Sequence, residues 1–535
     1  MNVYPKDAWF SYQASVAPVD ARYVEEQGSD GDTVVYLNMT CPLPEFEACS
    51  AKASDQLTSG SRFFLYDTVE ALSEGEWWWD AEAKTMLVWP TSATFPDGDG
   101  DAVVVPTVEQ VVWVKADNLV NGAPAADTDY VLNVTLENLR FSDSAYRRYG
   151  FQEGFNQWPE YPGFPDDGAL RISGGVNTVV RGCTFRDLGG AGLVASNATS
   201  NLVVEQNSFL RLGQSAVMLI GNATSQVTGA EVTHNDIRHI GLIHGSAGGV
   251  VLSSASYVGV RHNFISNIAR WGIHVRHFEA EGKGKSYSNV IEFNQVHNTG
   301  EQSNALGGIS VIATYGTTDV VDTVIRYNCI KNVVGYGKLD ERPYYSYGIF
   351  LDNEASGYTI HHNVIRDASF AAIKVHYGHD NTIYNNILMD SSYGPDEKSI
   401  GQFDTVGSPT HNTSGNEFYR NVLAWTDPVA YKMLQGETEK PYYDLIDNNL
   451  YYNAEVDIAT WNNSHLTPEG TWTNWTASGY DSASIVGDPL FTNWTGGSAC
   501  LASDSPAYHL DGFTEIPDVI CACADPMGSK QLANA

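Results

Sequence analysis

The chain has no apolar run of about 18 residues, so the sequence predicts no membrane-spanning helix. Its start, MNVYPKDAWF, lacks the basic and apolar stretches of a signal peptide. It also has no phosphate-binding loop of the Walker type and no Gly-x-Ser-x-Gly nucleophile elbow. The sequence therefore indicates neither a P-loop nucleotidase nor an enzyme with an elbow serine.

Positive charge is scarce, because 30 Lys and Arg residues stand against 64 Asp and Glu residues, for a net charge of −34. A field of that sign repels polyanions, so we expect neither nucleic acid nor an anionic membrane surface as a partner. It also counts against a polyuronate substrate, unless a local basic patch reverses the sign. The acidity and eight Asn-x-Ser/Thr sequons are typical of an exported glycoprotein, and we expect an extracellular location.

Cysteine is rare, and 7 in 535 residues are too few for a disulfide scaffold. Cys183 and Cys329 fall inside short apolar segments, where we expect small buried side chains. Two other groups could form bridges in an oxidising compartment: Cys41 with Cys49, and Cys500, Cys521 and Cys523. Most of the 14 His residues are unclustered, so no zinc site is predicted.

A repeat organises most of the chain. Its kernel is Asn-x-hydrophobic, as in THNDI, RHNFI and HHNVI. Successive kernels lie 23 to 35 residues apart, at Asn207, Asn235, Asn263, Asn294, Asn328, Asn363, Asn386, Asn421 and Asn449. A constant kernel with variable spacing indicates a fixed coil with loops of different size inserted at its corners.

Short segments that alternate with period 2, such as GVVLSS, GIHVRH and GIFLDN, flank the kernels. Stacked coil upon coil, they would bury an apolar column, with Asn side chains bonding between neighbouring coils at the bends. We predict an all-β fold, a right-handed parallel β-helix of about ten coils, since crossovers between parallel strands are right-handed in nearly all proteins. The predicted parts are a small β-rich domain over 1–102, the β-helix over 103–455 and an irregular capping segment over 456–535.

These kernels resemble the right-handed parallel β-helix superfamily of carbohydrate-active enzymes. Two flanking stretches, residues 61–90 (SRFFLYDTVEALSEGEWWWDAEAKTMLVWP) and 486–513, resemble segments of proteins like glycoside hydrolase family 141. The resemblance implies a small β domain inserted near the start of the helix, with a substantial portion before it, so the chain is expected to begin inside a longer protein. It also implies fucosidase or xylanase activity as possibilities.

Alignment of the strands on their Gly or Ala starts predicts which side chains point inward. Both inward columns are apolar: Leu193, Val217, Val250, Ile273, Ile309, Ile349 and Ile373, then Ala195, Leu219, Leu252, Val275, Val311, Leu351 and Val375. Ionisable side chains gather in the outward columns of the last coils. Because coils stack about 4.8 Å apart, Asp352 and His376 should be adjacent, Lys374 diagonal to Asp352, and Arg276 two coils away.

Asp352 is the candidate catalytic carboxylate, and His376 beside it is expected to orient it or tune its pKa. A surface salt-bridge ladder is the alternative, but long aromatic corner loops beside these coils favour a cleft. The partner carboxylate stays open between Asp340, Glu341, Glu354 and Asp404. The expected substrate-binding residues are His274, Arg276 and Lys374, with Trp271, Tyr315, Tyr344, Tyr345 and Tyr377 as surfaces on which sugar rings stack.

Three functions follow from this cluster. A glycoside hydrolase acting on a plant- or algal-type polysaccharide or oligosaccharide would use a carboxylate pair, and we place it first. A polysaccharide lyase would use Lys374 or His376 as base and Arg276 against a uronate, with calcium held by Asp352 and Glu354. A non-catalytic, glycan-binding β-helix would show scattered aromatic residues without an ionisable cluster.

Overall fold

The structure is a computed structural model of the 535-residue chain. It describes residues 72–90 and 104–145 with short gaps, then 168–277, 284–313, 319–335, 346–391, 401–407, 411, 413–426, 443–460 and 471–523. It also describes short strands before residue 65 and between 338 and 343.

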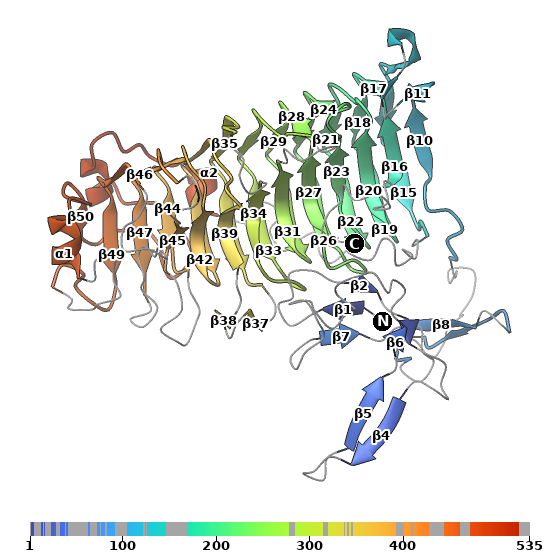
Figure 1. Cartoon of the computed structure of the whole chain (residues 1–535), viewed down its shortest axis with the longest axis horizontal. Helices are drawn as coiled ribbons and strands as arrows, with labels where there is room; N and C mark the ends of the chain where they lie inside the picture. Colours follow the sequence, from blue (N-terminus) through green and yellow to red (C-terminus); the bar gives the residue numbers. More distant parts are fainter. Residues whose placement is uncertain are drawn as a thin grey trace.

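Three long parallel sheets run along the described helix, and over most of its length each coil contributes one strand to each sheet (Figure 1). The first sheet has 10 strands: β10 (Val112–Lys115), β16 (Gly168–Ser173), β20 (Ala191–Ser196), β23 (Val217–Ile220), β27 (Gly248–Ser253), β31 (Trp271–Arg276), β34 (Leu306–Ile312), β39 (Ser346–Asp352), β42 (Ala371–His376) and β45 (Phe403–Val406). This confirms the predicted parallel β-helix.

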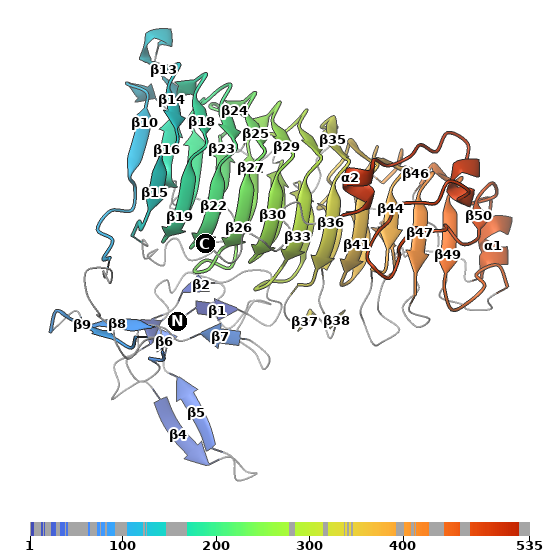
Figure 2. The ribbon, with the colours of Figure 1, turned by 180° about the vertical axis from the view of Figure 1, so that it is seen from behind.

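The second sheet has 11 strands: β14 (Thr135–Glu137), β18 (Val179–Arg181), β21 (Val203–Glu205), β25 (Glu231–Thr233), β29 (Gly259–Arg261), β32 (Val290–Glu292), β35 (Thr323–Arg326), β40 (Tyr358–His361), β43 (Thr382–Tyr384), β46 (Glu417–Tyr419) and β48 (Leu445–Asp447). The third has 12: β15 (Arg140–Ser142), β19 (Thr184–Leu188), β22 (Ser208–Leu212), β26 (Asp236–Ile240), β30 (Phe264–Ile268), β33 (Gln295–Thr299), β36 (Cys329–Val333), β41 (Val364–Ala368), β44 (Ile387–Met389), β47 (Val422–Trp425), β49 (Leu450–Asn453) and β50 (Ile485–Val486). Figure 2 shows the stacked strands of the β-helix from behind.

The kernel asparagines form a buried ladder at the corner between the second and third sheets. Asn294 is typical, because its Oδ1 accepts the backbone N–H and the side-chain amide of Asn263, at 3.0 and 2.9 Å. Its own amide donates to Val260 O at 2.8 Å and to Asn328 Oδ1 at 3.0 Å. The repeated Asn has a physical reason. Backbone N–H and C=O groups that point inward at each bend are shielded from water, so they need a hydrogen-bond partner from the protein, and the Asn side chain supplies it.

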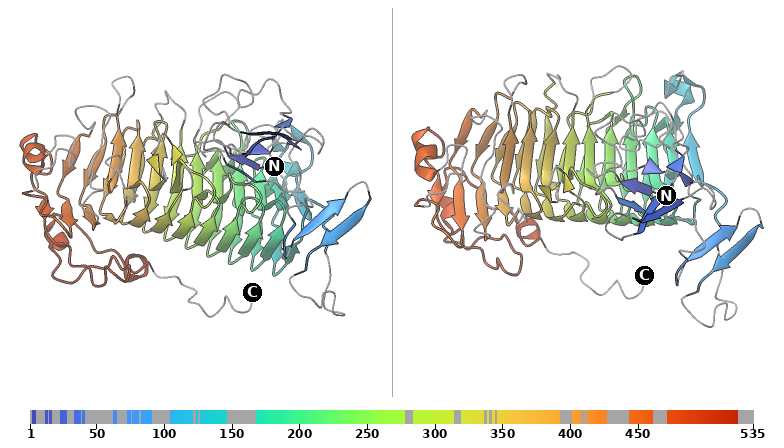
Figure 3. Two further views of the ribbon diagram at one scale, coloured as in Figure 1. Left: turned by 90° about the horizontal axis from the view of Figure 1, so that it is seen from below. Right: turned by 60° about the horizontal axis from the view of Figure 1, so that its bottom comes forward.

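Apolar side chains from the inward columns fill the interior. Leu193, Val250, Ile273, Ile349 and Ile373 are all 0% exposed and belong to one core cluster that runs through the coils. A second apolar cluster lies outside the third sheet, where the C-terminal segment of residues 499–521 packs on outward residues of β41, β44, β47 and β49. The segment includes α2 (Asp518–Cys521) and is visible beside these strands in Figures 2 and 3. The other helix, α1 (Trp472–Ala477), lies at the C-terminal end of the stacked coils. We call residues 499–523 the strap.

Two disulfides hold the strap. Cys500 bonds to Cys521, as the grouping of the C-terminal cysteines allowed. Cys523 bonds to Cys329 on β36, so the expectation that Cys329 is merely a small buried residue is wrong. The correction has a physical reason: Cys329 points outward from the third sheet, toward the strap. Cys183 is buried and free as expected, while Cys41 and Cys49 lie outside the described residues.

Before residue 90 the described strands pair only in antiparallel fashion: β1 (Asn2–Tyr4) with β2 (Tyr12–Gln13) and β7 (Arg62–Phe64), β3 (Ser15–Val16) with β6 (Met39–Thr40), β4 (Tyr23–Gln27) with β5 (Thr33–Leu37), and β8 (Trp77–Asp80) with β9 (Thr85–Val88). The division at residues 102 and 455 stays a prediction. None of the described helices is long and apolar enough to cross a membrane.

Candidate active site

The register of the first sheet places the predicted residues in the predicted columns. One outward column runs from Val251 through His274, Ser310, Phe350 and Lys374 to Asp404. The next runs from Ser253 through Arg276 and Ile312 to Asp352. His376 lies one coil beyond Asp352, opposite Val406. The alignment of the sequence therefore predicted the face correctly.

This outward face is buried over most of its length, which the sequence did not indicate. Ala191, Val194, Met218 and Val251 form an apolar cluster on the early coils and are at most 2% exposed. The ionisable residues that follow are covered as well, since His274, Arg276 and Lys374 are 2, 1 and 3% exposed. Charges on this face therefore interact through a medium of lower dielectric constant than the charges of a solvent-exposed salt-bridge ladder do.

Asp352 and His376 form a hydrogen-bonded pair at the edge of the covered region. The Asp352 Oδ1 to His376 Nδ1 distance is 2.7 Å, and both side chains are 22% exposed. The backbone N–H of Asn353 donates to the same oxygen at 2.9 Å. Because Nδ1 of His376 is bonded to the carboxylate, Nε2 is the ring nitrogen that would exchange a proton with a substrate.

A second carboxylate–imidazole pair adjoins the first. Glu354 stands in the turn after β39 with a φ of 66°, and its backbone N–H donates to His376 O at 2.9 Å. Its carboxylate contacts Nδ1 of His411, which is 29% exposed, while Glu354 is nearly covered. The Tyr377 ring links the two pairs, with its centroid 4.2 Å from that of His376 and 4.4 Å from that of His411.

The sequence analysis missed His411. This residue stands in a corner segment between β45 and β46, outside the repeating columns, so no periodicity marks it. Glu354 was one of several open alternatives, and its backbone N–H is bonded to His376 of the Asp352 pair, whereas Asp404 pairs with Lys374. The signal that pointed to Glu354 was its position in the turn directly after the strand of Asp352.

Lys374 and Asp404 form a buried ion pair. The ammonium of Lys374 lies 2.6 Å from Asp404 Oδ2, and the two side chains are 3 and 1% exposed. The same ammonium is 5.3 Å from the ring centroid of Tyr347. Breaking such a pair leaves an uncompensated buried charge, at a cost of about 3–5 kcal/mol. Asp404 is therefore held by a cation, unlike the half-covered Asp352.

Arg270, Trp271, His274 and Arg276 gather at β31. The Trp271 ring stacks on His274 with centroids 4.0 Å apart, and the Arg270 guanidinium carbon is 4.1 Å from the Trp271 centroid. Burial, and then repulsion by Arg276, lower the pKa of Arg270 to about 9. Burial and the charges of Arg276 and Arg270 hold the pKa of His274 well below its usual value. Trp271 is thus enclosed by its neighbours rather than open to a sugar ring.

Three predicted residues, Glu341, Tyr315 and Tyr345, lie outside the described residues, as do Asp340 and Tyr344. Tyr377 is described and adjoins both imidazoles. Within the described ranges, two groups of three side chains have metal-ligand spacing: His297, Cys329 and Cys523, and Cys500, Asp518 and Cys521. Each includes bridged cysteines, and neither includes Asp352 or Glu354, the pair considered for calcium.

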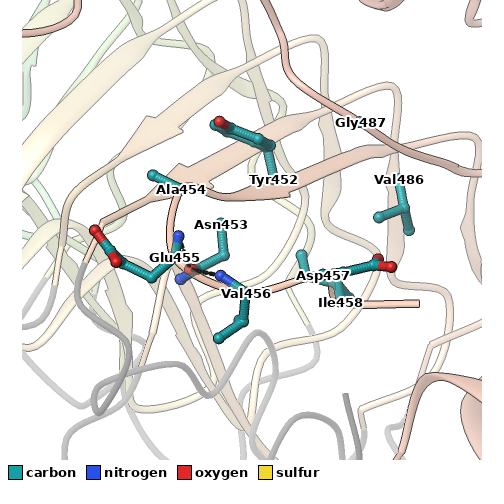
Figure 4. Close-up of a pocket in the computed structure, with 9 residues that line it drawn as sticks. All are labelled: Tyr452, Asn453, Ala454, Glu455, Val456, Asp457, Ile458, Val486 and Gly487. Carbon is teal, nitrogen blue, oxygen red and sulfur yellow. Dashed lines mark hydrogen bonds between the residues drawn. The ribbon is translucent and has the colours of Figure 1, made fainter. Parts of the chain in front are cut away.

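A separate pocket of about 360 Å³ lies at the C-terminal end of the stacked coils, beside β49. In Figure 4 the chain after Tyr452 curls around Asn453, whose Oδ1 accepts the backbone N–H groups of Glu455 and Val456 at 2.8 and 3.1 Å. The pocket is lined by residues 452–458, 486 and 487, and none of these belongs to the first sheet.

Residues 99–248 and 242–388, together more than half of the chain, match the family model described as the right handed beta helix region. The chain belongs to this β-helix family. The match confirms the handedness that the crossover rule predicted. A comparison with curated protein sequences finds no match.

Several solved structures are similar at low identity. A structure titled glycoside hydrolase is 14% identical with a TM-score of 0.44, and the match covers 78% of this chain and 67% of that one. XylC in complex with xylose is 12% identical with a TM-score of 0.34, over 61% of this chain and 55% of XylC, so the match spans little more than half of XylC. An alginate lyase from Paenibacillus is 19% identical with a TM-score of 0.32, over 53% and 87%. Likenesses this weak carry no argument about activity.

Proposed function

We propose that this β-helix protein is an extracellular carbohydrate-active enzyme, a glycoside hydrolase whose catalytic carboxylate is Asp352. The observation that carries the proposal is the Asp352–His376 pair, bonded at 2.7 Å and 22% exposed on both sides. It combines a defined geometry with access to solvent, on a face where the neighbouring ionisable groups are covered.

The chemistry needs a proton donor at the leaving oxygen and a group that activates water or attacks the anomeric carbon. Asp352 supplies one of these two roles, and His376 holds its carboxylate in place. Glu354 is the described carboxylate best placed for the other role, acting directly or through His411. Tyr377, in contact with both imidazoles, fixes their rings relative to each other.

A lyase is the second candidate, and a different observation favours it. Lys374 and Arg276 lie on the same face as Asp352, and cations there can neutralise the carboxylate of a uronate and lower the pKa of its α proton. His376 would then be the base, with Asp352 as the residue that orients it. The bonded pairs on this face count against the third alternative, a β-helix that only binds glycans.

A panel of plant and algal glycans tests these assignments. The hydrolase is expected to generate new reducing ends without an ultraviolet-absorbing product, and a calcium chelator is expected to leave its rate unchanged. Accumulation of an unsaturated uronate, with loss of rate on chelation, would replace the hydrolase by the lyase. Binding without any cleavage across the panel would support the non-catalytic alternative.

A further inference from the structure

The pocket beside β49 is not used by the proposed mechanism. Its volume of about 360 Å³ falls within the range of roughly 300–1,000 Å³ that small-molecule sites have. The coil of β49 is three coils beyond the coil of Asp352, which is about 14 Å along the helix axis at a coil spacing of about 4.8 Å. A ligand in this pocket would therefore not be the sugar at the catalytic carboxylate.

The room beside Tyr452 comes from a glycine. Strands β49 and β50 pair Tyr451 with Val486, so the register continues with Gly487 opposite Tyr452. Among the described residues, a Cβ atom at Gly487 would have only Ile485 Cγ2 within 4 Å, at 3.9 Å. The side chain of Tyr452, which is half-buried, thus borders open space on the following coil instead of a neighbouring side chain.

Polar groups line the same pocket. Asn453 is 4% exposed, and its Oδ1 holds the turn by accepting two backbone N–H groups. Its Nδ2 has no hydrogen-bond partner in the described part of the chain. Glu455 and Asp457 are exposed. The Asp457 carboxylate accepts the Ala459 N–H at 3.0 Å and the Thr460 hydroxyl at 3.1 Å, which leaves lone pairs on both oxygens. The lining thus offers an amide donor and two carboxylate acceptors.

The charge of the lining selects the class of ligand. No Lys, Arg or His is among the lining residues, so an anion in the pocket would be repelled by the two carboxylates. A calcium ion needs about 6–8 oxygen ligands that converge. In Figure 4, however, Glu455 and Asp457 point to opposite sides, and the described groups with metal-ligand spacing include neither residue. A neutral ligand with hydroxyl groups fits, because hydroxyls donate to carboxylates and accept from an amide.

Apolar surface completes the pocket. Ile458 is 0% exposed and belongs to the main core, while Val456 and Val486 are half-buried. A sugar ring has hydroxyls at its edge and C–H groups on its faces, and sites for such ligands combine an apolar wall with a few polar groups. We propose that this pocket binds one neutral sugar unit, away from the site of cleavage. The choice of a sugar among neutral polyols rests on the proposed function.

A larger side chain at Gly487 tests the proposal directly. The backbone there is outside the left-handed region and a Cβ has room, so Gly487→Leu is expected to fold and to fill part of the pocket. Ligand-detected NMR of the full chain with glucose, galactose and xylose should reveal a site that is present in the wild type and absent from Gly487→Leu. Gly487→Ala, which adds a single methyl group, should keep the site. Failure of all three sugars to bind, or binding that Gly487→Leu leaves unchanged, would overturn the proposal.

Glu455→Gln tests the polar part of the site without touching the backbone. The residue is exposed, so the variant should fold, and sugar binding should weaken about tenfold, the value of a hydrogen bond to a charged group. Glu137→Gln, with a side chain 48% exposed on the second sheet, is the matched control and should leave binding unchanged. Galacturonate carries the charge that the pocket repels. A galacturonate site that Gly487→Leu removes would contradict the assignment, as would equal sugar binding in Glu455→Gln and the wild type.

Failure of this inference can be told apart from failure of the proposed function. On a short oligosaccharide, Gly487→Leu is expected to keep kcat within about twofold of wild type, because the pocket lies on another sheet than Asp352. Cleavage that depends on Asp352, without a sugar site at Gly487, would remove the pocket from the account and keep the hydrolase. Sugar binding that depends on Gly487, without cleavage of any glycan, would keep the pocket and remove the hydrolase.

Discussion

The partner of Asp352 distinguishes it from the acids that form ion-pair ladders elsewhere on the helix. On the second sheet, Arg181 pairs with Glu205 at 2.5 Å, with side chains 44 and 24% exposed. Such pairs of fixed, opposite charge are worth a fraction of a kcal/mol. Asp352 is bonded to an imidazole, whose charge changes with a proton. This makes the pair suited to proton transfer, which an Arg–Glu pair is not.

Substitution of Asp352 by Asn should therefore separate catalysis from stability. We expect the Asp352→Asn chain to fold, because the residue points outward and the exchange is nearly isosteric, but to turn over substrate at least about a hundredfold more slowly. His376→Ala should also lower kcat, because the carboxylate loses the group that holds it. Initial rates on a confirmed substrate, with thermal unfolding measured alongside, check both changes.

Ser253 provides the matched control for that experiment. It stands in the same outward column as Arg276 and Asp352, in register with Arg276, and is 2% exposed. Ser253→Ala is expected to keep turnover within about twofold of wild type, since the residue lies on a coil away from the catalytic pair. Near-normal turnover in Asp352→Asn would remove Asp352 from the mechanism, whatever the control shows.

At the scale of the elements, the asparagine ladder explains why the fold could be predicted from the sequence, whereas the burial of the outward face of the first sheet could not. The Asn kernels repeat because every bend poses the same hydrogen-bonding problem, and the strand register follows from the apolar columns between them. The outward columns of the first sheet carry no such repeat. The burial of His274, Arg276 and Lys374 therefore left no periodic signal in the sequence, and His411 left none for the same reason.

The ladder makes a quantitative prediction about stability. Asn294→Ala removes a side chain that makes hydrogen bonds to Asn263, Val260 and Asn328 and leaves their polar groups buried without a partner. We expect the free energy of unfolding to fall by about 3 kcal/mol or more, since each unsatisfied buried group costs about 1–3 kcal/mol. Urea unfolding measures the loss. Glu205→Gln, at an exposed ladder pair, is expected to cost less than about 1 kcal/mol, and an equal loss in both variants would show that the ladder has no special role.

At the scale of the whole molecule, the net charge of −34 and the cations of the first sheet have opposite effects on an approaching anion. The net negative charge argues against polyanionic partners in general. Arg270 and Arg276 place positive charge beneath the surface, where screening by salt is weak, while the charge of Lys374 is balanced by Asp404. The composition could state this exception only as a condition, because only the stacking of the coils brings Lys374 to the same face as Arg276.

Acid should loosen the attachment of the strap to the helix. His361 and His362 contact each other through their Nδ1 atoms at 2.6 Å, and His362 Nε2 lies 2.6 Å from Thr514 Oγ1 of the strap. Such a contact between two imidazoles requires that at most one Nδ1 carries a proton, so it is lost when both rings are charged. Burial lowers the pKa of both residues to about 4, below the value of about 6.5 in an unfolded chain.

The sign of the effect follows from proton uptake. Above pH 6.5 the histidines are neutral in both states, and their contribution to stability is complete. As the pH falls from about 6.5 toward about 4, the unfolded chain binds protons that the folded chain does not, and the free energy of unfolding decreases. Half-buried Asp390 and buried Asp481, whose pKa values burial raises, titrate in the opposite sense. The comparison must therefore be made between variants at each pH.

His362→Gln isolates the contribution of the pair. Glutamine keeps a polar group near Thr514 but does not titrate, so the variant should lose less stability between pH 7 and pH 5 than the wild-type chain does. Hydrogen exchange of the Thr514 amide, which donates to Asn385 Oδ1 at 2.8 Å, should accelerate with acid in the wild type and less in the variant. His509→Gln, an exposed position in the same strap, serves as the control. If His362→Gln keeps the pH slope of the wild type while His509→Gln does too, the histidine pair does not control the strap.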